Sequence, residues 1–140
     1  LCTLGPDYIS VTYGAGGGTA GQSTAKIASY IKNGLHVEAL AHLTCVNSTR
    51  VQVEETLTRL REDNVENVLA LRGDINPDLP RRMDFLHASD LAKAIAQTGG
   101  FGVAGACYPE GHVESPSLKA DVESLRYKAE AGVSYHTVVL

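Results

Sequence analysis

The chain has 140 residues, of which 44% are hydrophobic and 20% charged, and its formal net charge is −4 at pH 7. These values are typical of one folded domain with a core of its own, and they exclude an intrinsically disordered chain. The acidic balance argues against nucleic-acid binding, and no apolar run is long enough to cross a membrane.

The predicted secondary structure alternates between strands and helices. Each strand begins roughly 30 residues after the last, which is the size of a βα unit and predicts a parallel sheet. Two architectures have this pattern: a (β/α)8 barrel and an open, doubly wound sheet. The predicted strands cover residues 8–13, 37–45, 65–71, 101–107 and 133–140, and the predicted helices cover about residues 21–32, 50–63, 91–97 and 117–131.

The predicted helices carry apolar residues at helical spacing. The first has Ile27 within such a stripe, with Asn33-Gly34 as its expected C-cap, and the last has Leu118 and Val122. We therefore expect these residues to face the core.

Polar and charged residues follow four of the predicted strands, at Thr12-Tyr13, His42–Thr44, Arg72–Asp74 and Tyr108–Glu110. In a parallel barrel the carboxyl ends of all strands meet around one mouth, where active sites form. An open sheet gathers its ligands at one switch point instead. Four successive polar strand ends favour the barrel.

Each of these features also has a simpler interpretation. Arg72 and Asp74 could form a mutual surface ion pair, and His42 could be a core histidine. Asp121, Ser124 and Lys128 share one helix face, which is typical of a solvated surface as well as of a site. The glycines of residues 14–18 could cradle a phosphate or form a flexible loop, because neither a GxGxxG fingerprint nor a P-loop lysine is present.

The cysteines, Cys2, Cys45 and Cys107, are too scattered for a CxxC metal site, and their odd number argues against a disulfide framework. We expect no metal, and reduced thiols in a cytoplasmic protein, with Cys45 and Cys107 as small buried hydrophobes. The chain begins without Met and ends inside an apolar run, so we expect residues 1–140 to be one domain fragment, truncated at both ends.

Five motifs, in this order, resemble those of the methylenetetrahydrofolate reductase family. They are Val11–Gly14 (VTYG), Ala41–Cys45 (AHLTC), Leu69–Asp74 (LALRGD), Ala88–Leu91 (ASDL) and Tyr108–His112 (YPEGH), and Asp121–Lys128 continues the match.

The resemblance covers nearly all of the chain. It implies a (β/α)8 TIM barrel roughly twice this length, of which this chain would hold the second to sixth strands.

The same resemblance implies a function in one-carbon metabolism and methionine synthesis. A flavoprotein of this family passes a hydride from NADH or NADPH through FAD to 5,10-methylenetetrahydrofolate and forms 5-methyltetrahydrofolate. The resemblance implies a cytoplasmic homo-oligomer when full length, without nucleic-acid or membrane partners. It also implies FAD binding without a Rossmann domain, which agrees with the missing fingerprint.

The resemblance also implies which residues form the site, because their positions match those of the family's site residues. Asp74 would also lie beside the folate as the catalytic carboxylate, where it would stabilise a cationic iminium formed from the substrate. Lys128 and His112 are chemically suited to the FAD pyrophosphate. The expected contacts with FAD come from Thr12, Tyr13, Ala15, His42, Arg72, Gly73, Asp74, His87, Ala88, Tyr108, His112, Asp121, Ser124, Tyr127 and Lys128.

The chain departs from the family pattern at several positions. The family's acidic residue on the first strand falls before Leu1, and Val139 is closest to the position of a glutamine that touches the pterin. Ser124 and Tyr127 replace more polar or basic residues, and His87 stands where an aromatic residue is common.

Two other interpretations are considered, and these departures favour the first of them. The first is an inactive fragment, or a non-catalytic binding or interaction domain derived from this barrel. The second is an unrelated barrel enzyme, such as an aldolase or a phosphate-binding isomerase. The aldolase lacks support, because no lysine lies near the end of a predicted strand, where it could form a Schiff base.

Overall fold

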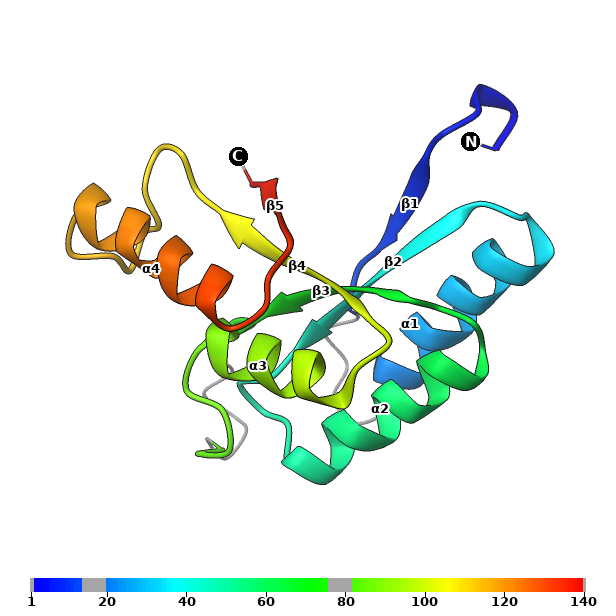
Figure 1. The fold of residues 1–140 in the computed structure, drawn as a ribbon, viewed down its shortest axis with the longest axis horizontal. Coiled ribbons are helices and arrows are strands. Elements are labelled where there is room, and N and C mark those ends of the chain that lie inside the picture. Colours follow the sequence, from blue (N-terminus) through cyan, green and yellow to red (C-terminus); the bar gives the residue numbers. More distant parts are fainter. Residues whose placement is uncertain (1, 14–19, 76–81, 140) are drawn as a thin grey trace.

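The computed structural model describes residues 2–13, 20–75 and 82–139, and these form one parallel sheet with a helix between successive strands (Figure 1). The strands are β1 (Tyr8–Val11), β2 (Glu38–Thr44), β3 (Asn67–Leu71), β4 (Gly102–Cys107) and β5 (Tyr135–Val138). The helices are α1 (Ala20–Ser29), α2 (Arg50–Glu62), α3 (Ala88–Thr98) and α4 (Leu118–Glu130), with a 3-10 turn at η1 (Cys2–Leu4) and a π-helical turn at η3 (Tyr30–Gly34).

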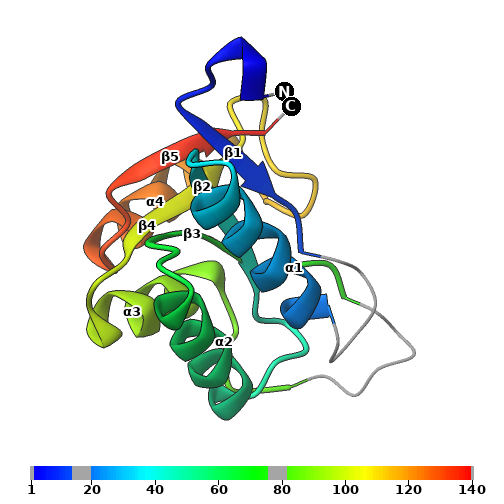
Figure 2. The same ribbon diagram turned by 90° about the vertical axis from the view of Figure 1, so that its right-hand side faces the viewer.

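The strand order identifies the architecture. Each strand pairs in parallel with its neighbour in the chain, in the order β1-β2-β3-β4-β5. A doubly wound sheet reverses its order at a switch point, whereas a barrel keeps it, so the doubly wound alternative is wrong. The sheet curls with α1, α2 and α3 on its outer side, as part of an α/β barrel (Figure 2).

The main core lies between the outer face of the sheet and the helices. Val53, Leu57 and Leu60 of α2 are each at most 2% exposed, as their spacing predicts. They belong to one buried cluster with Val68 of β3 and Leu91 of α3.

A second, smaller cluster covers the inner face. Leu40, Leu69 and Ala104 come from three adjacent strands, and Leu71 packs against them. Strands buried on both faces need apolar side chains at consecutive positions, which is why β3 and β4 consist almost entirely of apolar residues and glycine.

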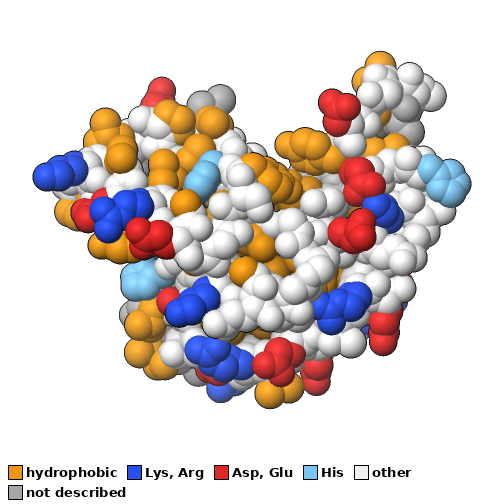
Figure 3. Space-filling model, in the orientation of Figure 1, with side chains coloured by type: hydrophobic (Ala, Val, Ile, Leu, Met, Phe, Trp, Pro, Cys, Tyr) orange, Lys and Arg blue, Asp and Glu red, His pale blue; other side chains and the backbone are white. Residues whose placement is uncertain are grey.

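Three residues expected in the core are exposed. Ile27 is 52% exposed on α1, and Leu118 and Val122 are 57% and 60% exposed on α4, which has no buried residue. Hydrophobic side chains gather on the surface over α4 and β5 (Figure 3). The helical spacing therefore predicted the helices correctly, but the prediction that these three side chains are buried is wrong.

The ends of two helices show how local sequence sets an element's bounds. At α2, the Thr49 hydroxyl accepts a hydrogen bond from the Gln52 amide, and the Gln52 side chain accepts one from the Thr49 amide. This capping box fixes the start of the helix. The expected cap at Asn33-Gly34 is wrong, because the π-helical turn carries the chain through Gly34, and the Leu35 amide donates to the Tyr30 carbonyl at 3.1 Å.

Cys45 and Cys107 are both free thiols. Cys45 is fully buried, as predicted, and burial raises its pKa to about 12, which keeps the thiol protonated and unreactive. Cys107 is only half-buried. Within the described ranges, none of the helices combines the length and apolar character needed to span a bilayer.

A candidate cofactor site at the carboxyl ends of the strands

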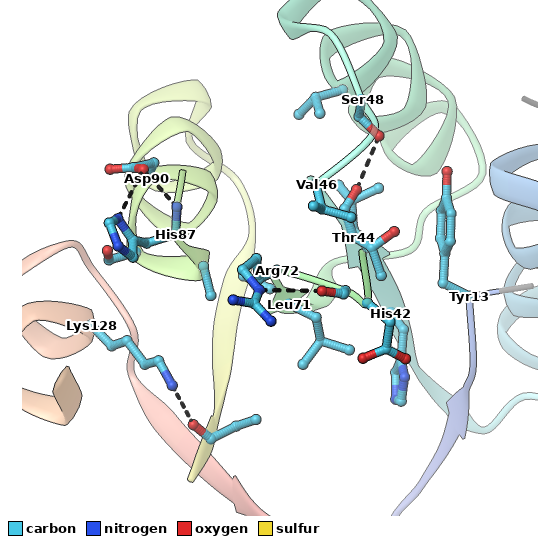
Figure 4. A pocket seen from close by; sticks show the side chains of 18 of the residues that line it. Tyr13, His42, Thr44, Val46, Ser48, Leu71, Arg72, His87, Asp90 and Lys128 are labelled. Atoms are coloured by element: carbon cyan, nitrogen blue, oxygen red, sulfur yellow. Dashed lines mark hydrogen bonds and ion pairs between the residues drawn. The ribbon is translucent and has the colours of Figure 1, made fainter. Parts of the chain in front are cut away.

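One large cavity of about 1590 Å³ lies at the carboxyl ends of the strands. Its walls come from the segments after β1, β2, β3 and β4, from α2, from the start of α3 and from one side of α4 (Figure 4). All the expected FAD-contacting residues line it except Ala15, which lies outside the described residues. The residues that it brings together are Thr12, Tyr13, His42, Arg72, Gly73, Asp74, His87, Ala88, Tyr108, His112, Asp121, Ser124, Tyr127 and Lys128.

The turn after β3 is fixed by a glycine. Gly73 has φ +83°, and a Cβ there would lie 3.0 Å from the Thr44 Cβ. The Arg72 carbonyl accepts hydrogen bonds from the amides of Cys45 and Val46 at 3.1 and 2.8 Å. Only glycine allows this close approach to the end of β2 without strain, so the turn holds Arg72 and Asp74 at the cavity.

Arg72 pairs with a residue outside the motifs that resemble the family. Its guanidinium lies 2.6 Å from a carboxylate oxygen of Glu114, in the segment between β4 and α4. The hydrogen bond and charge of Arg72 lower the pKa of the Glu114 carboxyl. The simple interpretation of Arg72 and Asp74 as a mutual surface ion pair is therefore wrong. Glu114 follows the YPEGH motif by two residues, and no local pattern marks it as a partner of Arg72.

His42 lies on the inner face of β2, half-buried at the cavity (Figure 4). Its Nε2 is 2.5 Å from the Ser10 hydroxyl of the neighbouring β1. Burial lowers the pKa of the imidazole from its ordinary value of 6.5, so His42 is neutral at neutral pH. His42 therefore has a polar partner, and it also faces the space in which a ligand would lie.

This burial predicts a pH dependence of stability. The folded state binds a proton at His42 less readily than the unfolded state, so stability is lost as the pH falls below about 6.5, towards the lowered folded pKa. We expect His42→Gln to reduce the loss of unfolding free energy between about pH 7 and pH 5. Urea denaturation at each pH measures this, with the exposed His36→Gln as control. An undiminished loss in His42→Gln contradicts the assignment.

The segment after β4 holds an aromatic and an imidazole ring together. Tyr108 and His112 make an edge-to-face contact with ring centroids 4.7 Å apart. The Glu114 amide donates to His112 Nδ1 at 3.1 Å, and the His112 amide donates to an Asp121 carboxylate oxygen at 2.9 Å. A neutral imidazole that accepts at Nδ1 carries its hydrogen on Nε2, so His112 has a donor available for a ligand.

The polar face of α4 turns towards the cavity. Asp121, Ser124 and Lys128 are all half-buried and line it, so the interpretation of this face as a solvated surface is wrong. Lys128 Nζ donates to the Ala106 carbonyl at 2.6 Å (Figure 4), and burial lowers its pKa. One of the three ammonium hydrogens is therefore used by β4, which leaves two for a ligand.

The start of α3 forms another part of the cavity wall. The Asp90 carboxylate accepts hydrogen bonds from the amides of Leu86 and His87, both at 2.9 Å, and this fixes the N-terminus of the helix. The His87 side chain is 74% exposed at the rim. Its imidazole can therefore contact only a ligand that reaches the edge of the cavity.

Among the described residues, no group of three His, Cys, Asp or Glu side chains is arranged to hold a metal ion.

The numbers of basic and acidic side chains along the cavity wall are nearly equal, and Glu114 is one of several acidic residues there. The basic residues on the wall are Arg59, Arg72, Arg82, Lys93 and Lys128, and the acidic ones are Glu55, Asp74, Asp90, Glu114, Asp121 and Glu130.

Comparison with solved structures supports the fold. A 2,3-dimethylmalate lyase, described as a member of the PEP mutase/isocitrate lyase superfamily, matches with a TM-score of 0.69 over 98% of this chain and 50% of its own. The two sequences are 14% identical, so this likeness extends to the architecture alone.

Comparison with other sequences gives the family. A 5,10-methylenetetrahydrofolate reductase of Pectobacterium carotovorum subsp. carotovorum is 37% identical over 134 residues, and one of Escherichia coli K12 is 34% identical over the same length. In both cases the match covers 96% of this chain and 44% of the relative, so the chain spans less than half the length of these relatives.

A plant relative is similar over most of this chain as well. The protein named methylenetetrahydrofolate reductase (NADH) 1 of Arabidopsis thaliana is 35% identical over 147 residues, which cover 94% of this chain and 25% of that protein. The sequence model of the family described as methylenetetrahydrofolate reductase matches residues 1–138. The chain belongs to the methylenetetrahydrofolate reductase family.

Proposed function

We propose that the full-length protein is a flavin-dependent reductase of 5,10-methylenetetrahydrofolate that uses NADH or NADPH, and that this chain forms most of its FAD site. One observation carries the proposal. Residues that the family resemblance implies as FAD contacts are far apart in the sequence, yet they line a single cavity. FAD would supply the hydride-carrying chemistry, and the protein would bind and orient the reactants.

The side chains around the cavity suit a dinucleotide. Arg72, Lys128 and the Nε2 of His112 provide donors for a pyrophosphate, and they stand on three different segments of the wall. Tyr13 and Tyr108 provide aromatic surfaces, and burial raises the pKa of each phenol, which keeps both uncharged. This arrangement needs no Rossmann glycine fingerprint.

Asp74 is the residue to which we assign a direct role in the reduction of the folate. It lies after β3 on the cavity wall. The pKa of Tyr108 is raised mainly by burial and also by the negative charge of Asp74. A fixed carboxylate at this place would stabilise a positive charge that develops on the substrate.

A second candidate is a non-catalytic binding domain derived from the same barrel. Val139 favours it, because an aliphatic side chain stands close to the position where the family pattern has a glutamine at the pterin. The Val139 amide donates to the Cys107 carbonyl at 3.0 Å, so the position lies directly beside the end of β4. The non-catalytic domain would bind a ligand without reducing folate.

The experiment is to measure FAD affinity and folate reduction in the full-length protein. We expect bound flavin in its absorbance spectrum and turnover with NADH or NADPH. Lys128→Gln should weaken FAD binding by about tenfold, the effect of losing one charged hydrogen bond. Lys119→Gln, an exposed position on the same helix, is the matched control. Flavin binding without turnover would favour the non-catalytic domain, and absence of flavin binding would contradict the proposal.

A further inference from the structure

The ion pair between Arg72 and Glu114 joins two segments across the cavity wall. Arg72 follows β3 and Glu114 follows β4, and both residues line the cavity. Their side chains are 30% and 53% exposed, so the pair is in contact with solvent and within reach of a bound molecule. An exposed pair of this kind contributes little to stability and can be broken by a competing charge.

Arg72 is the more firmly held partner. Its carbonyl accepts hydrogen bonds from the amides of Cys45 and Val46, and its Nε donates to the Gly73 carbonyl at 3.3 Å. Glu114 is held through its backbone, because its amide donates to His112 Nδ1, while its carboxylate lies at the end of a half-exposed side chain. The carboxylate can therefore leave Arg72 without disturbing the strand.

The pairing means that a ligand does not meet a free guanidinium. Arg72 faces Glu114 in direct contact, and the negative charge of Asp74 also acts on it. A pyrophosphate as a whole has more charge and more acceptor oxygens than one carboxylate, and its oxygens match the guanidinium fork. A phosphate can therefore replace Glu114 on Arg72, whereas an uncharged ligand cannot.

We propose that Glu114 is a specificity-determining residue that competes with the phosphate groups of the ligand for Arg72. The carboxylate occupies the guanidinium until a pyrophosphate displaces it. Glu114 thereby lowers the affinity for every phosphate-bearing ligand, and only those with further contacts in the cavity bind well. The identification of that ligand as FAD rests on the proposed function, and the competition itself does not.

The test compares Glu114→Gln with the wild-type full-length protein, stripped of bound flavin. FAD, riboflavin and inorganic pyrophosphate are titrated separately, by flavin fluorescence and by calorimetry. We expect Glu114→Gln to bind FAD and pyrophosphate about two- to fivefold more tightly, because the ligand no longer has to break an exposed ion pair. The affinity for riboflavin, which has no phosphate, should not change.

Two further variants make the result specific. Glu66→Gln removes the same charge from an exposed partner of Lys32 near the amino ends of the strands, and it should leave all three affinities unchanged. In a protein that already has Arg72→Gln, the additional change Glu114→Gln should give no gain. Circular dichroism confirms that each variant is folded.

The other outcomes overturn the proposal. Weaker FAD binding by Glu114→Gln would mean that the carboxylate orients Arg72, and an unchanged affinity for FAD and pyrophosphate would mean that the pair persists in the complex. An equal gain for riboflavin would exclude competition with phosphate. If the wild type binds no flavin but Glu114→Gln still gains affinity for pyrophosphate, the competition holds and the proposed FAD function fails.

Discussion

Asp74→Asn in the full-length protein is expected to slow the reduction of 5,10-methylenetetrahydrofolate by about 100-fold, the usual cost of removing one electrostatic stabiliser from a transition state. Asparagine keeps the shape of the side chain and removes its charge. The oxidation of NADH or NADPH should change much less, because it does not develop a positive charge on the folate. Stopped-flow measurement of the two half-reactions separates these effects.

The matched control for this variant is Asp7→Asn, an exposed residue that precedes β1, at the opposite ends of the strands from the cavity. It should leave both half-reactions unchanged. Equal slowing of the two half-reactions by Asp74→Asn would indicate that Asp74 acts on flavin binding or on the fold. In that case the role assigned to its carboxylate in folate reduction would be wrong.

The largest loss of stability is expected from Gly132→Ala. Gly132 follows α4 with φ +106°, and a Cβ there would lie 2.6 Å from the Cβ of Ala96 on α3. Neither methyl group can rotate away, so the two helices must separate or the backbone must move. We expect the free energy of unfolding to fall by about 3 kcal/mol, from backbone strain and overpacking together.

Gly99→Ala separates these two causes. Gly99 has φ +73° and ψ 162°, a region that only glycine adopts readily, and no atom lies within 4 Å of the position that a Cβ would take there, so only the backbone strain remains. The expected loss is about 2 kcal/mol, the cost of holding a non-glycine residue in this region. Urea denaturation of the full-length variants measures both losses. Equal losses would show that the contact between Gly132 and Ala96 relaxes without cost.

Local sequence determined much of the secondary structure. The start of α2 at Arg50 was predicted because the Thr49 cap depends on residues only three apart. The alternation of predicted strands and helices indicated a parallel sheet, and β3 and β4 have the consecutive apolar residues that strands buried on both faces need. The polar residues at the strand ends predicted a shared site, because a parallel barrel brings the carboxyl ends of its strands together.

Only the tertiary structure decided which side chains are covered and which charges pair. Leu118 and Val122 have the spacing of a core face, but their exposure depends on what packs against α4, which the spacing does not specify. Arg72 pairs with Glu114 and not with Asp74, and His42 contacts Ser10 from a neighbouring strand. The sequence determined the fold and the place of the cavity through short-range patterns, whereas these partners are many residues apart and meet only when the sheet curls.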